Sequence, residues 1–281
     1  MKTYSTILIC LFAISNAIGQ TIHIQEYDWD ALQKTKPWEA TEKWSPVPKI
    51  VTPGIINSMA PSDAIVLFDG HDLDEWHKPK YCWGAGYQDT KGHIENNILE
   101  NFPGTDAEWH IKSGAIEVVP GGGNLATKKK FGSAQLHIEW LPPVDPGKEG
   151  QLYSNSGVFF MGLYEIQVLN SYENKTYPNG QAGSVYKQHI PLVNANKPPG
   201  EWQSYDIIFN APKFDKEGQL IQKATFTVFM NGVLVQNNAE VKGPTFYIGE
   251  GKYIPHPEKM PLILQDHGDK VRFRNIWIRE I

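Results

Sequence analysis

Alternating apolar and polar residues predict short β-strands along most of this chain. Residues 134–140 place Leu136, Ile138 and Trp140 on one side of a strand and polar residues on the other, because successive side chains of a strand point to opposite faces. Residues 164–169 repeat the pattern. A strand with one apolar and one polar face is typical of a sheet that covers a hydrophobic core on one side.

Two further segments extend this pattern toward the end of the chain. Residues 226–235 contain two apolar runs separated by Asn231-Gly232, a dipeptide that favours the tight turn of a β-hairpin. Residues 271–278 alternate arginines with apolar residues and predict a last strand. From residue 64 onward such runs are divided by clusters of Gly, Pro, Asn and Asp, and helical patterns are scarce. The sequence therefore predicts an all-β sandwich.

The first 60 residues have a different pattern. Residues 1–19 combine Lys2, a short apolar run and small residues up to Gly19, which is typical of an export signal. We therefore expect cleavage near Gly19 and a periplasmic or secreted protein, with lipid anchoring as the less favoured alternative. Residues 20–60 contain three tryptophans and four prolines with little periodicity. We interpret them as an extended leader wrapped on the main domain, which we place at residues 61–281.

Composition narrows the class of protein further. Hydrophobic residues make up 41% of the chain, with 9 Trp, 12 Tyr and 12 Phe, which is enough for one large core. Beyond the export signal only Cys82 is left, so no disulfide can form within the chain. The net charge is −5 without a basic cluster, which argues against a nucleic-acid partner. No later apolar run approaches the roughly 20 residues of a transmembrane helix.

Several short motifs, taken in order and spacing, are more specific than any one alone. They are Leu67-Phe-Asp-Gly70, Asn155-Ser-Gly-Val-Phe159, Tyr164-Glu-Ile-Gln-Val168, Gly183-Ser-Val-Tyr186, Gly200-Glu-Trp202, Asn231-Gly232, Leu264-Gln-Asp-His-Gly268 and Phe273-Arg-Asn-Ile276. Through them residues 63–281 resemble the bacterial 3-keto-disaccharide hydrolases, also described as 3-keto-glucoside lyases and 3-keto-2-hydroxyglucal hydratases. The resemblance implies a concanavalin A-like jelly-roll β-sandwich. It also implies an oligosaccharide or glycoside substrate whose 3-hydroxyl has been oxidised by a partner sugar 3-dehydrogenase.

The chemistry of such a substrate defines what the site must contain. A 3-keto group acidifies the hydrogen on C2, so a base can remove it and the resulting enediolate can expel the glycosidic oxygen from C1. Water can then add back, which gives net hydrolysis. The site needs a base within reach of C2–H, an acid for the leaving oxygen, and donors or a cation for the enolate charge.

Glu165 is the first candidate for the base or for a metal ligand, because burial of a mid-strand carboxyl would raise its pKa toward neutrality. His267 is the second candidate, since imidazole acts as an acid or a base near neutral pH. Glu139 could stand across the sheet from Glu165. Further candidates are polar groups that could bind a sugar, Gln167, Lys187, Asn155 and Gln265, and aromatic side chains that could stack on its ring, Trp83, Trp109 and Tyr186.

Each candidate also has a plainer interpretation. Glu139 could lie on the solvated face of a sheet, His267 in an ordinary turn, and Trp109 in the core. Residues 266–269 offer oxygen ligands of the kind that calcium prefers, so a divalent cation is a candidate cofactor, although no calcium-loop spacing occurs. The rival functions are a lectin-like carbohydrate-binding protein and a glycoside hydrolase with two carboxyl groups. The latter would need Glu139 and Glu165 about 5–10 Å apart.

Overall fold

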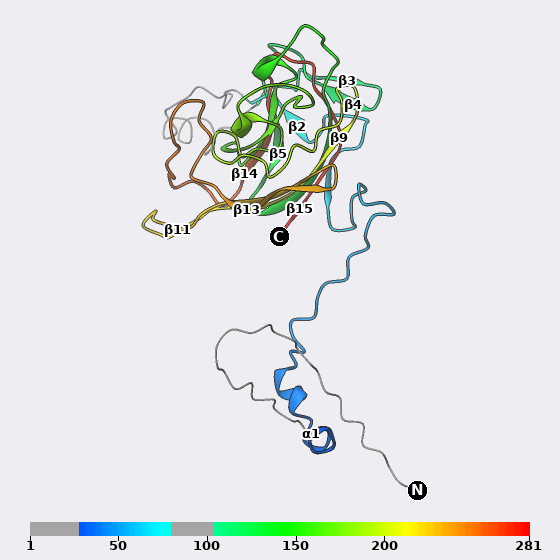
Figure 1. The fold of residues 1–281 in the computed structure, drawn as a ribbon, viewed down its shortest axis with the longest axis vertical. Coiled ribbons are helices and arrows are strands. Elements are labelled where there is room, and N and C mark those ends of the chain that lie inside the picture. Colours follow the sequence, from blue (N-terminus) through cyan, green and yellow to red (C-terminus); the bar gives the residue numbers. More distant parts are fainter. Residues whose placement is uncertain (1–27, 80–103) are drawn as a thin grey trace, which may run out of the picture. The chain divides into compact units, whose positions relative to one another are not determined.

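The computed structural model describes residues 28–79 and 104–281 (Figure 1). The expected export signal at residues 1–19 lies outside the described residues, as do Cys82 and Trp83. The chain divides into two units, residues 1–50 and 51–281. Within the described ranges, no helix is long and apolar enough to cross a membrane.

The first unit contains a short α-helix, α1 (Trp29–Thr35), followed by a 3-10 helix at Pro37–Thr41. The carboxylate of Asp28 caps α1 by accepting hydrogen bonds from two backbone N–H groups of its first turn, both at 3.1 Å. The helix ends at Lys36, which has a left-handed backbone with φ of 45°. Residues 29–41 are therefore helical where the sequence pattern indicated an extended leader.

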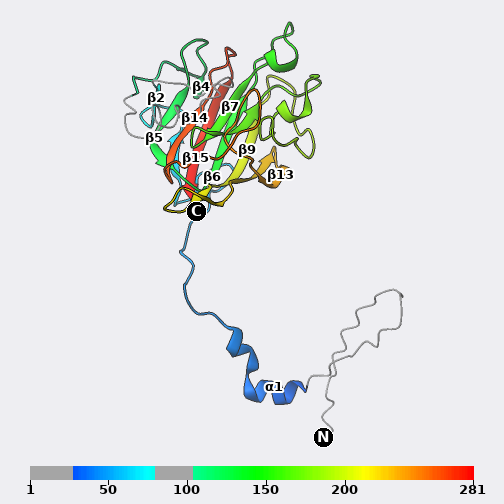
Figure 2. The same ribbon diagram turned by 90° about the vertical axis from the view of Figure 1, so that its left-hand side faces the viewer.

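The second unit is a sandwich of antiparallel sheets, which confirms the predicted all-β jelly-roll of the concanavalin A-like class. Its eight-stranded sheet has the order β13-β12-β9-β6-β15-β4-β3, with β1 paired to β15. These strands are β1 (Ile65–Phe68), β3 (His110–Lys112), β4 (Ala115–Glu117), β6 (Ala134–Leu141), β9 (Gln203–Asn210), β12 (Thr225–Met230), β13 (Val233–Glu240) and β15 (Arg272–Glu280). Figure 2 shows β6, β9 and β15 lying side by side.

The second sheet has five strands in the order β2-β5-β14-β7-β8. They are β2 (Trp76–His77), β5 (Leu125–Phe131), β14 (Met260–Leu264), β7 (Ser156–Phe160) and β8 (Tyr164–Val168). Short 3-10 helices at Gly150–Leu152 and Pro178–Gly180 lie in its connecting loops, and a separate ribbon pairs β10 (Lys213–Phe214) with β11 (Leu220–Gln222).

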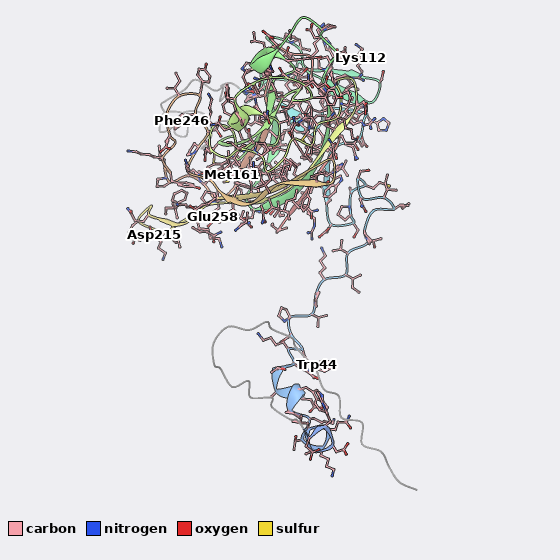
Figure 3. The ribbon with its side chains drawn as sticks, viewed as in Figure 1. Trp44, Lys112, Met161, Asp215, Phe246 and Glu258 are labelled. Atoms are coloured by element: carbon pink, nitrogen blue, oxygen red, sulfur yellow. The ribbon has the colours of Figure 1, made fainter. Side chains whose placement is uncertain are left out.

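One hydrophobic core lies between the two large sheets. Ile138 and Trp140 of β6 share a single buried cluster with Ile166 and Val168 of β8. Met161, labelled in Figure 3, belongs to this cluster and lies at the turn between β7 and β8. The alternation read from the sequence therefore gives the correct inward residues on both sheets, and the polar residues between them point away from the core.

The predicted hairpin and the last strand differ in how closely they follow the sequence pattern. Asn231 and Gly232 join β12 to β13 with φ of 52° and 78°, which confirms the hairpin turn. In β15 the register is irregular between Arg274 and Trp277, and Asn275 has φ of 48°. This bulge adds one residue to the strand.

The bulge changes which side chains of β15 share a face. In a regular strand, two residues three positions apart point to opposite faces. Here Arg274 and Trp277 both point outward, while Phe273 and Ile276 both belong to the core. The simple alternation expected for this strand therefore holds only as far as Arg274.

Candidate functional site

The outer face of the five-stranded sheet carries three of the candidate residues. The register places Glu165 of β8 opposite Phe159 of β7, and Gln167 opposite Gly157. Gln265 follows β14, and its N–H donates to the carbonyl oxygen of Gly157 at 3.0 Å. Two neighbouring rows of side chains therefore cross this face, and the structure brings Glu165, Gln167 and Gln265 to the same side of the sheet.

The Glu165 side chain is 2% exposed and packs against the backbone of β7. A Cβ atom at Gly157 would lie 2.6 Å from Glu165 Oε1, so only glycine leaves room for the carboxyl group. The side-chain amide of Gln167 lies 2.9 Å from Glu165 Oε1 and donates to it in the orientation that turns its nitrogen toward the carboxyl group. Among residues 28–79 and 104–281, nothing donates a hydrogen bond to Glu165 Oε2.

This environment sets the protonation of the carboxyl group. Burial raises the pKa of Glu165 well above its usual range, because the charged form loses its hydration. A carboxyl in this state can hold a proton near neutral pH and is a stronger base once ionised. Buried polar atoms are normally satisfied in a purely structural role, so the unused Oε2 marks Glu165 as a candidate functional group.

A cluster of two tyrosines and a lysine is joined to β8 at Glu165 through the backbone of Tyr186. The hydroxyl groups of Tyr177 and Tyr186 are 2.8 Å apart, and the N–H of Tyr186 donates to the carbonyl oxygen of Glu165 at 3.2 Å. Burial raises the pKa of both hydroxyls, and the negative charge of Glu165 adds to this effect. The Lys187 ammonium lies 3.9 Å from the centre of the Tyr177 ring and 5.4 Å from that of Tyr247.

Sequence reasoning named Tyr186 and Lys187 but missed Tyr177 and Tyr247. Both missed residues lie on loops, and neither belongs to a strand with readable alternation. Tyr177 precedes the 3-10 helix at Pro178–Gly180, whose last residue is buried against the tyrosine ring. An aromatic residue in an otherwise polar and turn-rich loop was the signal that could have indicated it.

Asn155 holds the loop at the start of β7 in place. Its N–H donates to Asp269 Oδ2 at 2.8 Å, and its side-chain amide donates to the carbonyl oxygen of Gln151 at 2.8 Å. Asp269 also pairs with the Lys148 ammonium. Asn155 is 5% exposed, so it borders the site mainly as a fixed part of the loop structure.

The turn that contains His267 has its carboxylates held by protein donors. His267 is exposed and, within the described residues, makes no hydrogen bond to Glu165. The Asp266 carboxylate accepts from the N–H groups of Gly123 at 3.0 Å and Gly268 at 2.9 Å, and Asp269 is engaged as described above. No group of three or more His, Cys, Asp or Glu in the described part of the chain is arranged to hold a metal ion. The turn therefore does not fit the expected divalent cation, because protein donors already use its carboxylates.

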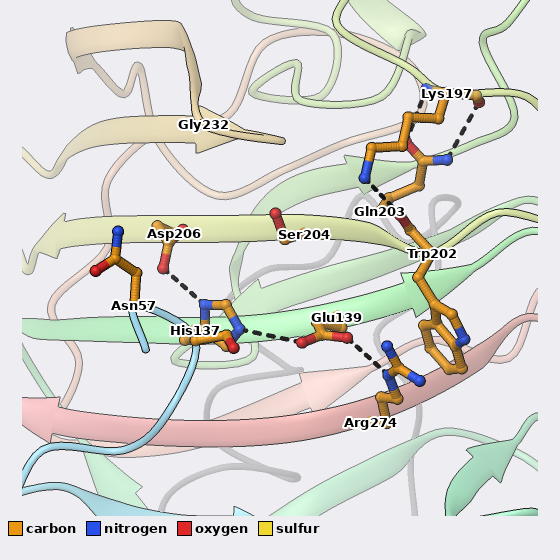
Figure 4. Close-up of a pocket in the computed structure, with 11 residues that line it drawn as sticks. Asn57, His137, Glu139, Lys197, Trp202, Gln203, Ser204, Asp206, Gly232 and Arg274 are labelled. Atoms are coloured by element: carbon orange, nitrogen blue, oxygen red, sulfur yellow. Dashed lines mark hydrogen bonds and ion pairs between the residues drawn. The ribbon is translucent and has the colours of Figure 1, made fainter. Parts of the chain in front are cut away.

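Two candidate residues, Glu139 and Trp109, do not lie beside Glu165 as expected. Glu139 is on the outer face of the eight-stranded sheet, where Oε2 accepts from Arg274 Nε at 2.7 Å (Figure 4). The core separates it from Glu165, so the two carboxyl groups do not form one site. Trp109 is 4% exposed, stacks on Phe273 at 6.0 Å and donates to a backbone carbonyl at 2.7 Å, so it is a core residue and is not available to a sugar ring.

The comparisons with known proteins agree with this fold. Residues 63–279 match the sequence profile of the 3-keto-alpha-glucoside-1,2-lyase-like domain. A crystal structure from Parabacteroides distasonis ATCC 8503, provisionally named a glycosyl hydrolase, is 44% identical with a TM-score of 0.74, and the match covers 86% of this chain and 96% of that one. A second structure of the same provisional name and organism is 17% identical with a TM-score of 0.51, covering 78% and 94%, and shows the fold alone. The search of curated proteins gave no match.

Proposed function

Because the chain belongs to the 3-keto-alpha-glucoside-1,2-lyase-like family, we propose that it is a carbohydrate-active enzyme that cleaves 3-keto-glycosides by elimination followed by hydration. The observation that carries the proposal is the desolvated carboxyl of Glu165, with its raised pKa and unused Oε2. A base of this kind is what removal of the C2 hydrogen requires. We infer the substrate class from the family and the catalytic base from the environment of Glu165.

In the first step Glu165 Oε2 takes the proton from C2, and the electron pair of that bond moves onto the 3-keto oxygen as an enediolate. The enediolate then re-forms the ketone, a C1–C2 double bond forms, and the C1–O bond to the aglycone breaks. The departing oxygen takes a proton from the Tyr177–Tyr186 hydroxyl pair, whose raised pKa keeps it protonated until then.

In the second step water adds across the double bond. Its hydroxyl joins C1, its proton returns to the Tyr177–Tyr186 hydroxyl pair, and Glu165 returns the proton it took to C2, so the overall reaction is hydrolysis. The Gln167 amide lies beside the carboxyl, and the Lys187 ammonium lies over the Tyr177 ring. These two groups are proposed to hold the enediolate oxygen. Since Glu165 is 2% exposed, contact between Oε2 and C2 requires the covering side chains to move when the sugar binds.

The lectin-like alternative is less well supported. A sugar-binding protein needs aromatic rings and amides on an accessible face, and gains nothing from a buried carboxyl with an unused oxygen. Three expectations remain proposals with the mechanism: a sugar 3-dehydrogenase that oxidises C3 beforehand, export to the periplasm or beyond, and a divalent cation. Metal analysis of the purified protein, with an assay before and after chelation, tests the cation.

The decisive experiment measures aglycone release from a 3-keto-glucoside and from its unoxidised parent. We expect release from the keto compound alone, loss of release in Glu165→Gln, and strong reduction in Tyr177→Phe. Glu240→Gln is the matched control, because that glutamate lies on β13 and pairs with a surface lysine. His267→Ala tests the second candidate in parallel.

Deuterium on C2 of the keto substrate provides an independent check. If proton abstraction at C2 limits the rate, release slows with the deuterated compound. Equal release from the parent glucoside, or undiminished release by Glu165→Gln, would contradict the proposed elimination.

A further inference from the structure

A second polar site lies on the outer face of the eight-stranded sheet, across the core from Glu165. A depression of about 380 Å³ is present there (Figure 4). Its rim is formed by Asn57 and Ser58, by the loop that contains Lys197 and Trp202, and by the β12–β13 hairpin. The candidate residues discussed above, apart from Glu139, do not take part in it.

The floor of the depression is a chain of four charged side chains from three adjacent strands. Asp206 of β9 lies opposite His137 of β6, and Glu139 of β6 lies opposite Arg274 of β15. His137 Nδ1 is 2.7 Å from Asp206 Oδ1, and His137 Nε2 is 3.7 Å from Glu139 Oε1. Arg274 Nε completes the chain at 2.7 Å from Glu139 Oε2, so the charges alternate in sign (Figure 4).

The contacts within this group hold the two middle residues, His137 and Glu139, in their charged forms near neutral pH. Burial lowers the pKa of His137, but the hydrogen bond to Asp206 and the ion pair with Glu139 outweigh it and raise the pKa to about 9. Burial raises the pKa of Glu139, but the ion pair with His137 and hydrogen bonds from Asn275 and Arg274 outweigh it and lower the pKa to about 2. Two cations and two anions balance on the floor, and the Lys197 ammonium on the rim already donates to the carbonyl oxygen of Trp202 at 3.1 Å. This arrangement suits a neutral polar ligand better than an ion.

The four charged side chains do not use all of their hydrogen-bonding groups. The Arg274 guanidinium lies 3.9 Å from the centre of the Trp202 ring, which fixes its plane, and only Nε has a partner among the described residues. Asp206 uses Oδ1 and leaves Oδ2 open, and Ser204 Oγ lies between them on the same face. The Asp206 and Arg274 side chains are 41% and 42% exposed. Donors and acceptors are therefore presented together, as neighbouring sugar hydroxyls require.

We propose that this depression is a second, non-catalytic binding site for a neutral saccharide, whose neighbouring hydroxyls accept from Arg274 and donate to Asp206. The proposal goes beyond the elimination reaction and uses none of the groups assigned to it. Ion pairs that only braced the three strands would explain the alternating charges, but they would not explain a depression lined with open donors and acceptors.

The test is an NMR titration of the full chain with maltose, following the indole N–H of Trp202 and the side-chain N–H groups of Arg274. We expect saturable shifts of these signals. The dissociation constant should rise about tenfold or more in Arg274→Gln and Asp206→Asn, since each loses a hydrogen bond to a charged group. Ser204→Ala leaves the charged chain intact and should weaken binding to a smaller extent.

Two controls separate this proposal from general damage and from the elimination reaction. Arg279→Gln removes an arginine–carboxylate pair at 2.7 Å from the same strand outside the depression, and it should bind maltose as the unmodified protein does. Glu165→Gln should also retain these shifts. Absence of saturable shifts at Trp202 overturns the proposal. So does an unchanged dissociation constant in Arg274→Gln, or a response of Arg274 to acetate alone, which would indicate an anion site.

Discussion

Replacing Glu165 by glutamine should stabilise the folded protein at high pH while it abolishes the proposed reaction. The folded state holds the Glu165 proton more tightly than the unfolded chain does, because burial raises the pKa of this carboxyl. Between the unfolded pKa and the raised folded pKa, the folded state therefore binds one more proton. Over that window the free energy of unfolding falls by about 1.4 kcal/mol for each pH unit of increase. Glutamine has nearly the same shape as a protonated glutamate and does not titrate.

The assay is urea unfolding of both proteins at several pH values from about 5 to 9, with the difference in unfolding free energy taken at each pH. The difference isolates residue 165, since other titrating groups contribute equally to both proteins. We expect it to be small at the acid end and to grow in favour of the variant as pH rises. Glu240→Gln, on an exposed side chain, should show no such trend. A flat difference, or a variant that is less stable at every pH, would refute the assignment of Glu165 as a desolvated base.

Three further predictions follow from single contacts. Gly157→Ala places a Cβ 2.6 Å from Glu165 Oε1 and 2.7 Å from the Phe159 ring, so it should cost about 1–3 kcal/mol of stability and lower turnover of a 3-keto-glucoside, measured on the same sample. His137→Gln should remove a stabilisation that is complete below pH 6.5 and lost as pH rises through about 9; thermal unfolding of both proteins from pH 6 to 10 checks this sign. Gly232→Ala, at φ of 78°, should lower stability by about 1 kcal/mol without changing turnover, since the hairpin needs a left-handed residue there.

Local alternation was sufficient to predict the parts of the fold that depend on neighbouring residues. The inward faces of β6 and β8 follow directly from a period of two, and so does the outward placement of Glu165 and Gln167. The hairpin at Asn231 follows from turn chemistry. Each of these features is decided within a few residues of sequence.

The composition of the site depends on contacts that the sequence pattern does not encode. Whether Glu139 shares a face with Glu165 is decided by which sheet each strand joins, and alternation within one strand carries no information about this. Tyr177 reaches Tyr186 only because a loop folds back over the five-stranded sheet. The helix α1 was missed because its seven residues are too few to show a clear helical period.

The bulge at Asn275 shows how a surface can change without altering the protein interior. The extra residue projects a side chain that donates to the carbonyl oxygen of Ser58 at 2.9 Å and to Glu139 Oε1 at 2.9 Å. Deleting Asn275 would restore the regular period of β15 and leave Phe273 and Ile276 facing inward. Loss of one codon at this point would therefore remove one of the two donors to Ser58, leaving the Trp277 indole N–H as the other at 2.9 Å, and remodel the nearby depression while the sandwich stays in register.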